Sequence, residues 1–174
     1  MEFRLEPFSL PGSDEDRVQL AALLCACVRG GASIGFLADI AAAEATEYWD
    51  GVLRAVAAGA KLLLVARDEA GAVVGSVQVA WESRRNGGHR AEVQKLMVLP
   101  AWRGRDLGSR LMETAETRAR ERAVRILFLD TSEGAGGAKA FYEKLGYTHV
   151  GGIPGYALDP DGTPTRNAVF YKEL

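Results

Sequence analysis

Basic and small side chains crowd together just before an apolar helical pattern. In the run WRGRDLGSRLM, Arg103 and Arg105 flank Gly104, and Gly108 follows shortly after. The first turn of a helix leaves backbone N–H groups unpaired and carries the positive end of the helix dipole, so it attracts an anion. Arginine side chains pair with phosphate oxygens, and glycines let the backbone approach closely. The run therefore predicts a site for a diphosphate.

The residue spacing does not match the other ligand-binding motifs that we considered. The run does not match the dinucleotide fingerprint G-x-G-x-x-G directly after the first strand, and GAGGAKA at 134–140 lacks the Lys-Ser/Thr pair of a P-loop. Cys25 and Cys27 lie in an early apolar segment, and His89 and His149 are not spaced to complete a zinc site with them. We expect no metal site, and we expect both thiols to be buried in the core.

The flanking sequence alternates between strand and helix patterns that must position this run. Ser13, followed three residues later by Asp16, predicts a capping box at the start of an early helix. Pro100 ends the strand that leads into the anion-binding run. The expected elements are a strand over 3–8, helices over 13–28 and 44–59, strands over 61–68, 73–82 and 91–100, a helix over 107–123, a strand over 125–130, a helix over 137–146, and strands within 147–158 and 167–174.

The helix over 107–123 has one apolar side and one charged side. Glu116 and Arg120 are expected to pair on its exposed side. Asp106, which immediately precedes the helix, is expected to cap its N-terminus through the carboxylate. The side expected to face the core holds Leu107, Leu111, Met112, Ala115 and Ala119.

The order of the elements predicts one α/β domain over residues 1–174, with a mixed β-sheet flanked by helices on both faces. Strand 91–98, helix 107–123 and strand 125–130 form a βαβ unit, so the two strands should be parallel. Ligands in such sheets bind beyond the carboxyl ends of parallel strands, which is where the anion-binding run lies. We therefore expect the site at the cleft between these two strands.

Composition and charge narrow the class of protein. The chain has 174 residues, of which 48% are hydrophobic and 25% charged, as expected for one packed domain. A net charge of −2 and a pI near 5.8 argue against a nucleic-acid partner. No apolar run approaches the roughly 20 residues of a membrane span, and the first residues do not resemble a signal peptide. We expect a cytoplasmic protein with no membrane partner.

The runs VQKLMVLPAWRGRDLGSRLM and RILFLDTSEGAGGAKAFYEKLGY resemble the GNAT superfamily of acyl-coenzyme A dependent N-acetyltransferases, and the resemblance in element order covers nearly the whole chain. It implies the GNAT fold and acetyl-CoA as the cofactor. The family's phosphate-binding pattern, Q/R-x-x-G-x-G/A, matches residues 103–108 except that Asp106 replaces the first motif glycine. This carboxylate adds negative charge beside a negative ligand, so we expect weakened cofactor binding that Arg103 and Arg105 partly offset.

The resemblance also implies which residues contact the cofactor. Backbone groups of Leu96, Met97 and Val98 would receive the pantetheine arm and polarise the acetyl carbonyl. The family's frequent asparagine, seven residues before the late tyrosine, is Ala135 here, which removes one polar contact. The implied cofactor-binding residues are Leu96, Met97, Val98, Arg103, Gly104, Arg105, Asp106, Leu107, Gly108, Ser109, Ala138, Lys139 and Tyr142.

Three residues are candidates for the chemistry. Tyr142 matches the tyrosine that in many family members protonates the departing thiolate, and a phenol with a pKa near 10 can do so. The alternative is that Tyr142 is a core residue. An amine that arrives protonated needs a base, for which Glu92 and Asp130 are the candidates. The alternative for these carboxylates is that each merely caps the end of a buried strand.

The resemblance implies an enzyme, an acetyltransferase that moves acetyl from acetyl-CoA to a primary amine of a small molecule by direct attack. The segment LDTSEG and the tail over 151–174 resemble the branch that includes the tabtoxin-resistance acetyltransferase, which implies an amino-acid-like, toxin or antibiotic acceptor. Asp106 and Ala135 keep open a non-catalytic acyl-CoA sensor or an interaction domain of the same fold. The tail itself suits either a lid over the acceptor or a homodimer surface.

Overall fold

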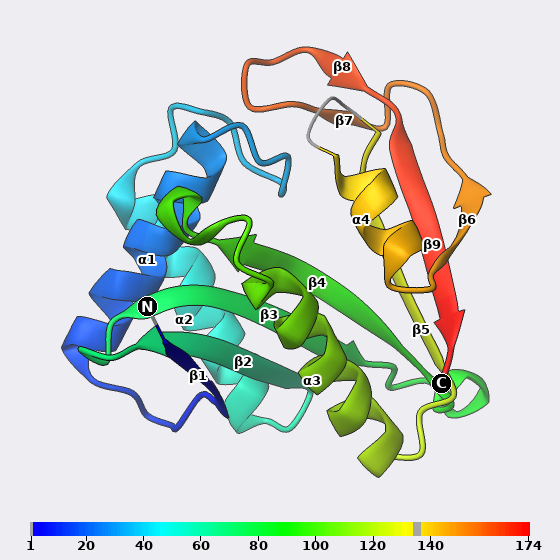
Figure 1. The fold of residues 1–174 in the computed structure, drawn as a ribbon, viewed down its shortest axis with the longest axis horizontal. Helices are drawn as coiled ribbons and strands as arrows, with labels where there is room; N and C mark the ends of the chain where they lie inside the picture. Colours follow the sequence, from blue (N-terminus) through cyan, green and yellow to red (C-terminus); the bar gives the residue numbers. More distant parts are fainter. Residues whose placement is uncertain (1, 134–136) are drawn as a thin grey trace.

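The computed structural model describes residues 2–133 and 137–174, which form a seven-stranded mixed sheet with helices on both faces (Figure 1). The strand order is β1-β2-β3-β4-β5-β9-β6, and β7 and β8 form a separate hairpin. The elements are β1 (Phe3–Pro7), α1 (Asp14–Arg29), α2 (Ala42–Ala57), β2 (Lys61–Asp68), β3 (Val73–Trp81), η1 (Arg85–Gly87), β4 (Arg90–Val98), η2 (Pro100–Trp102), α3 (Leu107–Glu121), β5 (Ile126–Ser132), α4 (Ala138–Lys144), β6 (Thr148–Gly151), β7 (Ala157–Leu158), β8 (Pro164–Thr165) and β9 (Asn167–Glu173).

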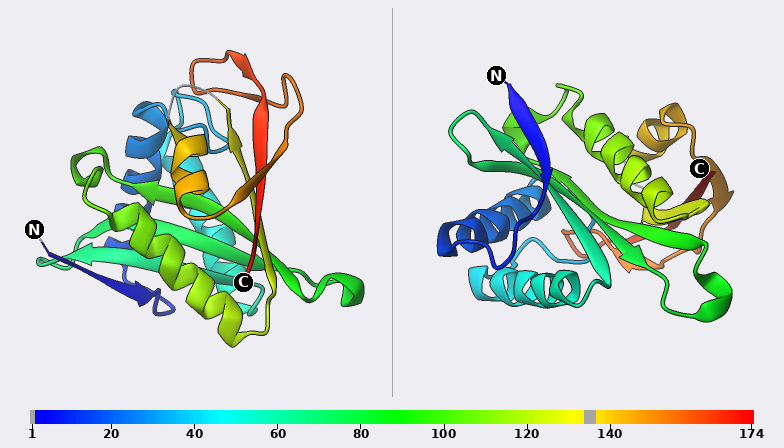
Figure 2. Two further views of the ribbon diagram at one scale, coloured as in Figure 1. Left: turned by 45° about the vertical axis from the view of Figure 1, so that its right-hand side comes forward. Right: turned by 90° about the horizontal axis from the view of Figure 1, so that it is seen from below.

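The predicted sheet and its two helical layers are confirmed. Helices α1 and α2 cover one face of the sheet, whereas α3 and α4 lie on the other (Figure 2). Alternate residues of β2 feed two separate cores, because successive side chains of a strand point to opposite faces. Leu63 and Val65 pack with α1 and α2, and Leu64 and Ala66 pack with α3. Cys25 and Cys27 are buried free thiols, as predicted.

The predicted parallel pair opens into a gap. Strands β4 and β5 are parallel, but their pairing ends at Glu92 and Phe128. Beyond this point β4 continues to Val98 and β5 to Ser132, and the two strands diverge (Figure 1). Their unpaired ends leave room for a ligand to enter between the two halves of the sheet.

A bulge bends β4 at the edge of this gap. Gln78 of β3 pairs with Gln94, whereas Ser76 pairs with Met97, so two residues of β4 stand opposite one residue of β3. Lys95 is one of the two, and it adopts a φ of 51°. Such a bulge re-aims side chains, so Lys95 does not follow the strict alternation of the strand.

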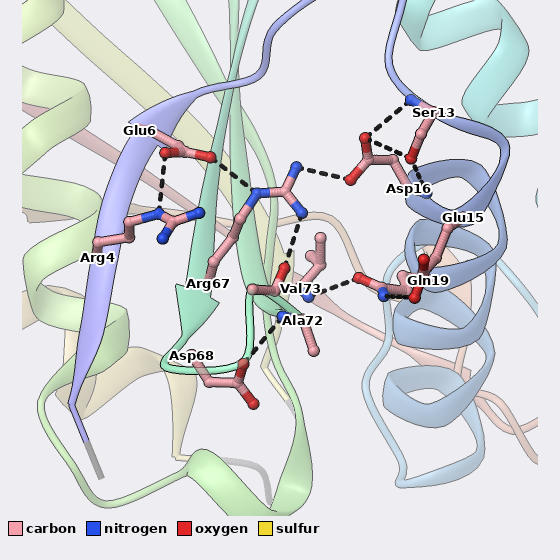
Figure 3. Close-up of polar contacts among 11 residues, drawn as sticks. Arg4, Glu6, Ser13, Glu15, Asp16, Gln19, Arg67, Asp68, Ala72 and Val73 are labelled. Carbon is pink, nitrogen blue, oxygen red and sulfur yellow. Dashed lines mark hydrogen bonds and ion pairs between the residues drawn. The ribbon is translucent and has the colours of Figure 1, made fainter.

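A polar network joins the first strands of the sheet to the start of α1 (Figure 3). Ser13 and Asp16 form the predicted capping box, in which each accepts a hydrogen bond from the backbone of the other. The Arg67 guanidinium pairs with Asp16 at 2.7 Å and with Glu6 at 2.8 Å. Although partial burial opposes it, hydrogen bonds from Ser13 and Arg67 hold the pKa of Asp16 below its usual value. One arginine therefore joins β1, β2 and the start of α1.

The expected pair of Glu116 and Arg120 on α3 is confirmed, but the exposed position expected for Glu116 is wrong. Glu116 is buried with 5% of its surface exposed, because Lys172 of β9 reaches both of its carboxylate oxygens at 2.8 Å. Arg120 lies 3.5 Å from the same carboxylate. The sequence could not show this because the partner comes from the last strand. The predicted apolar side of α3 is confirmed: Leu107, Leu111, Met112, Ala115 and Ala119 are all buried.

Within the described ranges, none of the helices has the length and apolarity that crossing a bilayer would require.

Candidate active site

A cavity of about 1010 Å³ opens where β4 and β5 diverge. The start of α3 and one side of α4 line it. The connection between α1 and α2 and the hairpin β7–β8 also line the cavity, together with residues 92–98 of β4. One continuous cavity thus joins the anion-binding run to the carboxylates singled out from the sequence.

The turn into α3 forms the end of the cavity where the sequence predicts an anion. Gly104 adopts a φ of 71°, a left-handed conformation that favours glycine. The Arg103 side chain donates from Nε to the carbonyl oxygen of Val98 at 3.3 Å, which holds the turn against the end of β4. Of the residues predicted to bind the cofactor here, those that line the cavity are Arg103, Gly104, Asp106, Leu107, Gly108 and Ser109.

Asp106 does not cap α3 through its side chain, so that expectation is wrong. It occupies the N-cap position with φ of 62° and ψ of 3°, and its carboxylate accepts no capping hydrogen bond. This left-handed geometry is the one that glycine adopts most readily, although aspartate tolerates it better than most residues. The backbone N–H groups of Leu107, Gly108 and Ser109 therefore begin the helix without a side-chain cap, as a site for an anion requires.

Two predicted basic contacts lie outside the lining of the cavity. Arg105 places its guanidinium 5.6 Å from the centre of the Trp102 ring, and Lys139 is not among the lining residues. A phosphate contact from either stays a prediction. Ala138 does line the cavity, and Ala135 lies outside the described residues.

Tyr142 lies at the wall of the cavity, on α4. Its ring packs against Phe141, Tyr147 and Phe170, and 8% of its surface is exposed. Burial raises the pKa of Tyr142, and the charge of Asp130 raises it further. Its hydroxyl makes no hydrogen bond to any residue that the structure describes. Tyr142 is therefore a core residue, as the second alternative has it, that also lines the cavity, and its role as a proton donor stays a prediction.

The end of β4 forms the part of the cavity wall between the turn into α3 and Tyr142. Leu96, Met97 and Val98 all line the cavity, although the Met97 side chain itself is buried among α1 and α2. The Val98 carbonyl accepts from Arg103 and from the Cys27 thiol, which lies 3.5 Å away. Because β4 has parted from β5 here, its backbone can meet a ligand instead of a neighbouring strand.

Glu92 belongs to a chain of polar side chains that the sequence analysis missed. The Gln94 amide donates to Glu92 at 2.7 Å, and Lys61 donates to the Gln94 side-chain oxygen at 2.6 Å. Lys61 also donates to Gln78 at 3.1 Å, whose amide in turn donates to the Tyr48 hydroxyl at 2.8 Å. A signal was present in the sequence, because Gln78 interrupts the apolar run of β3 and Glu92 and Gln94 alternate with apolar residues along β4.

Asp130 lies across the gap from this chain. It is exposed at the end of β5, and Asn167 of β9 donates to it at 3.4 Å. Both predicted carboxylates thus line the same cavity, one on each of the diverging strands.

The C-terminal hairpin reaches over to the connection between α1 and α2. The Ala38 N–H donates to the carbonyl of Pro160 at 2.8 Å. Asp159 accepts from Thr165 at 2.7 Å and from Ser132 at 3.0 Å, which fixes the hairpin against β5. The side of the cavity away from α3 is therefore bridged by two segments far apart in the sequence.

Comparison with known proteins assigns the family. The family model for the GNAT acetyltransferases matches residues 23–147, which include β4, the turn into α3 and Tyr142. The chain belongs to the GNAT acetyltransferase family. A relative described as an IAA acetyltransferase, from Azospirillum brasilense, is 34% identical over 125 residues, which are 72% of this chain and 78% of the relative.

Solved structures of the family share the whole fold. A ribosomal-protein-alanine N-acetyltransferase from Brucella melitensis superposes with a TM-score of 0.78 at 19% identity, covering 100% of both chains. An acetyltransferase structure from Salmonella typhimurium that contains its cofactor acetyl-CoA gives a TM-score of 0.79 at 16% identity, covering 100% of this chain and 95% of the other. At these identities the likeness establishes the GNAT fold and leaves the acceptor open.

Proposed function

We propose that this GNAT protein transfers acetyl from acetyl-CoA to a primary amine of a small molecule by direct attack. The observation that carries the proposal is one cavity that joins the uncapped start of α3 to the Tyr142 hydroxyl and to the carboxylates of Glu92 and Asp130. These are the groups needed to hold a diphosphate, supply a proton and accept one.

The residues present fit acetyl-CoA. The N–H groups of Leu107, Gly108 and Ser109, together with Arg103, would hold the diphosphate, and the edge of β4 would hold the pantetheine arm. Gly108 lies beside the Phe141 ring of α4, which a methyl group at this position would approach to 3.4 Å. When bound, the cofactor supplies an activated acetyl group. The chain's own task is to orient it and to exclude water.

Proton transfer is assigned to residues on opposite sides of the gap. Tyr142 is protonated near neutral pH, as a phenol with the ordinary pKa of about 10 already is, so its hydroxyl can donate a proton to the leaving sulfur. Burial and the charge of Asp130 raise its pKa, so the hydroxyl gives up this proton only to a strongly basic group such as the departing thiolate. Glu92 or Asp130 takes the proton of the incoming amine, directly or through water. Glu92 is held by Gln94, whereas Asp130 is exposed and hydrogen-bonded to Asn167, so a different network positions each carboxylate.

The acceptor that we propose is amino-acid-like or a toxin or antibiotic of similar size, in line with the tabtoxin-resistance branch that the sequence resembles. Solved relatives of the fold act on different amines: one is described as a ribosomal-protein-alanine N-acetyltransferase, and another as an aminoglycoside 6′-N-acetyltransferase complexed with coenzyme A. The bridge between Ala38 and Pro160 narrows the acceptor side, which favours a small molecule over a folded protein.

A single domain over residues 1–174 and a second copy of the chain as its partner remain our proposals for organisation. Exposed apolar side chains gather along β6 and β7, and light scattering would measure whether they join two copies. They are Val150, Ile153, Tyr156 and Leu158.

A second candidate function is a non-catalytic acyl-CoA sensor, which Asp106 favours. The carboxylate stands at the uncapped start of α3, where it opposes a negatively charged ligand. A sensor would bind cofactor and release no thiol when an amine is added.

The deciding experiment follows thiol release from acetyl-CoA against amino acids, polyamines, aminoglycosides and peptides, beside thermal unfolding with coenzyme A. Amine-dependent release supports the transferase. A ligand at 100 times its dissociation constant stabilises the folded state by about 2.7 kcal/mol, so binding is visible as a raised Tm. A raised Tm without release by any amine supports the sensor, and no change in Tm contradicts both candidates.

A further inference from the structure

Lys95 is a half-buried cation that lines the cavity. It lies on the bulge of β4, and its ammonium makes no hydrogen bond or ion pair with any residue that the structure describes. The ammonium lies 6.0 Å from the centre of the Phe36 ring, and a methyl group at Gly35 would come within 3.2 Å of it. The connection between α1 and α2 thus covers a lysine that points into the cavity.

Lys61, a second lysine that lines the cavity, has hydrogen-bond partners for its ammonium group. Lys61 donates to Gln78 and Gln94, whereas among the described residues Lys95 is compensated by the more distant charges of Asp130 and Glu92. Burial lowers the pKa of Lys95, the charge of Lys61 lowers it further, and the two carboxylates oppose the change. Buried ammonium groups are normally hydrogen-bonded, so a ligand group is the expected missing partner.

We propose that Lys95 binds a carboxylate of the acceptor, which makes the acceptor a small zwitterion of the amino-acid kind. This rests on the proposed transferase function and adds its substrate class. Glu92 and Asp130 face the amine of such a molecule, and Lys95 faces its acid group. The cavity then offers charges of both signs to a ligand that carries both.

The position of Lys95 along β4 fits an acceptor whose amine and carboxylate are close together. Lys95 directly precedes Leu96, the first residue of the segment that we assign to the acetyl end of the cofactor. Lys95, Glu92 and Asp130 all line the same cavity, so one small molecule can place its carboxylate at Lys95 and its amine at the two carboxylates.

Polycationic acceptors should bind weakly to the part of the cavity that Lys95 and Lys61 line. A polyamine or an aminoglycoside would bring further positive charge towards Lys95 and Lys61, and like charges in a partly desolvated site repel. The two lysines thus discriminate against these acceptors while they attract an acid.

The test uses acceptors in matched pairs that differ in one charge. We would measure kcat/KM for L-methionine against L-methioninamide and L-phenylalanine against L-phenylalaninamide, beside putrescine and kanamycin. The variants are Lys95→Gln, Lys95→Arg as the conservative rescue, and Arg85→Gln. Arg85 is an exposed residue of η1 outside the cavity, so its variant controls for the loss of a cation elsewhere.

We expect the natural protein and Arg85→Gln to prefer each acid over its amide by about tenfold or more, as for a charge-assisted hydrogen bond. Lys95→Gln should bring that ratio close to one by raising KM for the acid, and Lys95→Arg should restore most of it. Equal use of acids and amides by the natural protein, or a ratio that Lys95→Gln leaves unchanged, overturns the carboxylate site while the transferase stands.

A binding measurement separates this proposal from the transferase itself. The same acids and amides are titrated calorimetrically into the protein saturated with coenzyme A, which requires no turnover. If no amine releases thiol, the transferase fails, and the titration still decides the site. Tighter binding of the acid that Lys95→Gln abolishes supports it, and equal or absent binding of acid and amide overturns it.

Discussion

Replacing Asp106 by glycine should tighten the binding of coenzyme A. Asp106 holds the left-handed conformation at the start of α3 without capping it, so glycine can take the same backbone path. The substitution removes an exposed carboxylate from the end of the helix where we propose that the diphosphate binds. We expect the dissociation constant to fall and the fold to remain unchanged.

The charge of Asp106 determines the expected change in affinity for coenzyme A, and its backbone conformation determines the expected change in stability. Two unit charges about 6 Å apart in water repel by about 0.7 kcal/mol, so a diphosphate gains about 1 kcal/mol after screening, or roughly fivefold in affinity. The left-handed conformation costs an ordinary residue about 1–2 kcal/mol, less for aspartate, and glycine adds about 0.5–1 kcal/mol of lost chain entropy on folding. These two backbone terms oppose each other, so we expect the free energy of unfolding to change by less than about 1 kcal/mol.

Isothermal titration calorimetry with coenzyme A at low and high salt measures the predicted gain, and thermal unfolding checks the fold. Asp106→Asn separates the two causes, because asparagine also tolerates the left-handed region and carries no charge. It should tighten binding about as much as Asp106→Gly. Glu173→Gln removes another exposed carboxylate outside the cavity lining and should leave the affinity unchanged.

The salt dependence can refute this reasoning. If charge is the cause, the gain shrinks at high salt, since exposed charges are screened. Unchanged affinity in both Asp106 variants would show that the carboxylate does not oppose the ligand. A gain in Asp106→Gly alone would show that the backbone, and not the charge, limits binding.

Four further substitutions test the site and its support. Arg103→Ala should raise KM for acetyl-CoA with a smaller effect on kcat in steady-state assays, because this side chain binds ground and transition states alike. Tyr142→Phe should lower kcat about tenfold to a hundredfold and leave the calorimetric affinity for coenzyme A unchanged. Lys172→Met should destabilise the protein by about 2–4 kcal/mol in urea unfolding, because it leaves the buried Glu116 carboxylate with Arg120 at 3.5 Å. Gly75→Ala should cost about 1–3 kcal/mol in the same assay, since its methyl group would lie 2.7 Å from Leu107.

Each of these expectations has an outcome that contradicts it. An Arg103→Ala variant with an unchanged KM would remove that side chain from the phosphate site, with Arg85→Ala as the matched control. Full kcat in Tyr142→Phe would assign the proton to water or another group. The double variant Glu116→Leu/Lys172→Met should recover most of the lost stability, because replacing a whole buried pair costs far less than breaking it.

Local patterns in the sequence were sufficient for most helices and strands of the fold, whereas the anion site before α3 stays a prediction. The capping box of Ser13 and Asp16, the apolar side of α3 and the parallel βαβ unit are confirmed. Each depends on residues close in the chain, whose spacing follows from the periods of helix and strand. The motif before α3 predicted a helix start for an anion, and the structure has that start uncapped.

Contacts between distant segments were decided by the tertiary structure. Glu116 is buried because Lys172, 56 residues later, reaches it from β9. The sequence predicted a side-chain cap at Asp106 because aspartate is common at the N-cap position of helices. In the structure the turn holds Asp106 in a left-handed conformation, and its carboxylate does not cap α3. The polar chain from Tyr48 to Glu92 and the covered ammonium of Lys95 arise where three strands and the connection of two helices meet. Periodicity shows which face of an element is buried, but the partner across that face is fixed when the elements pack.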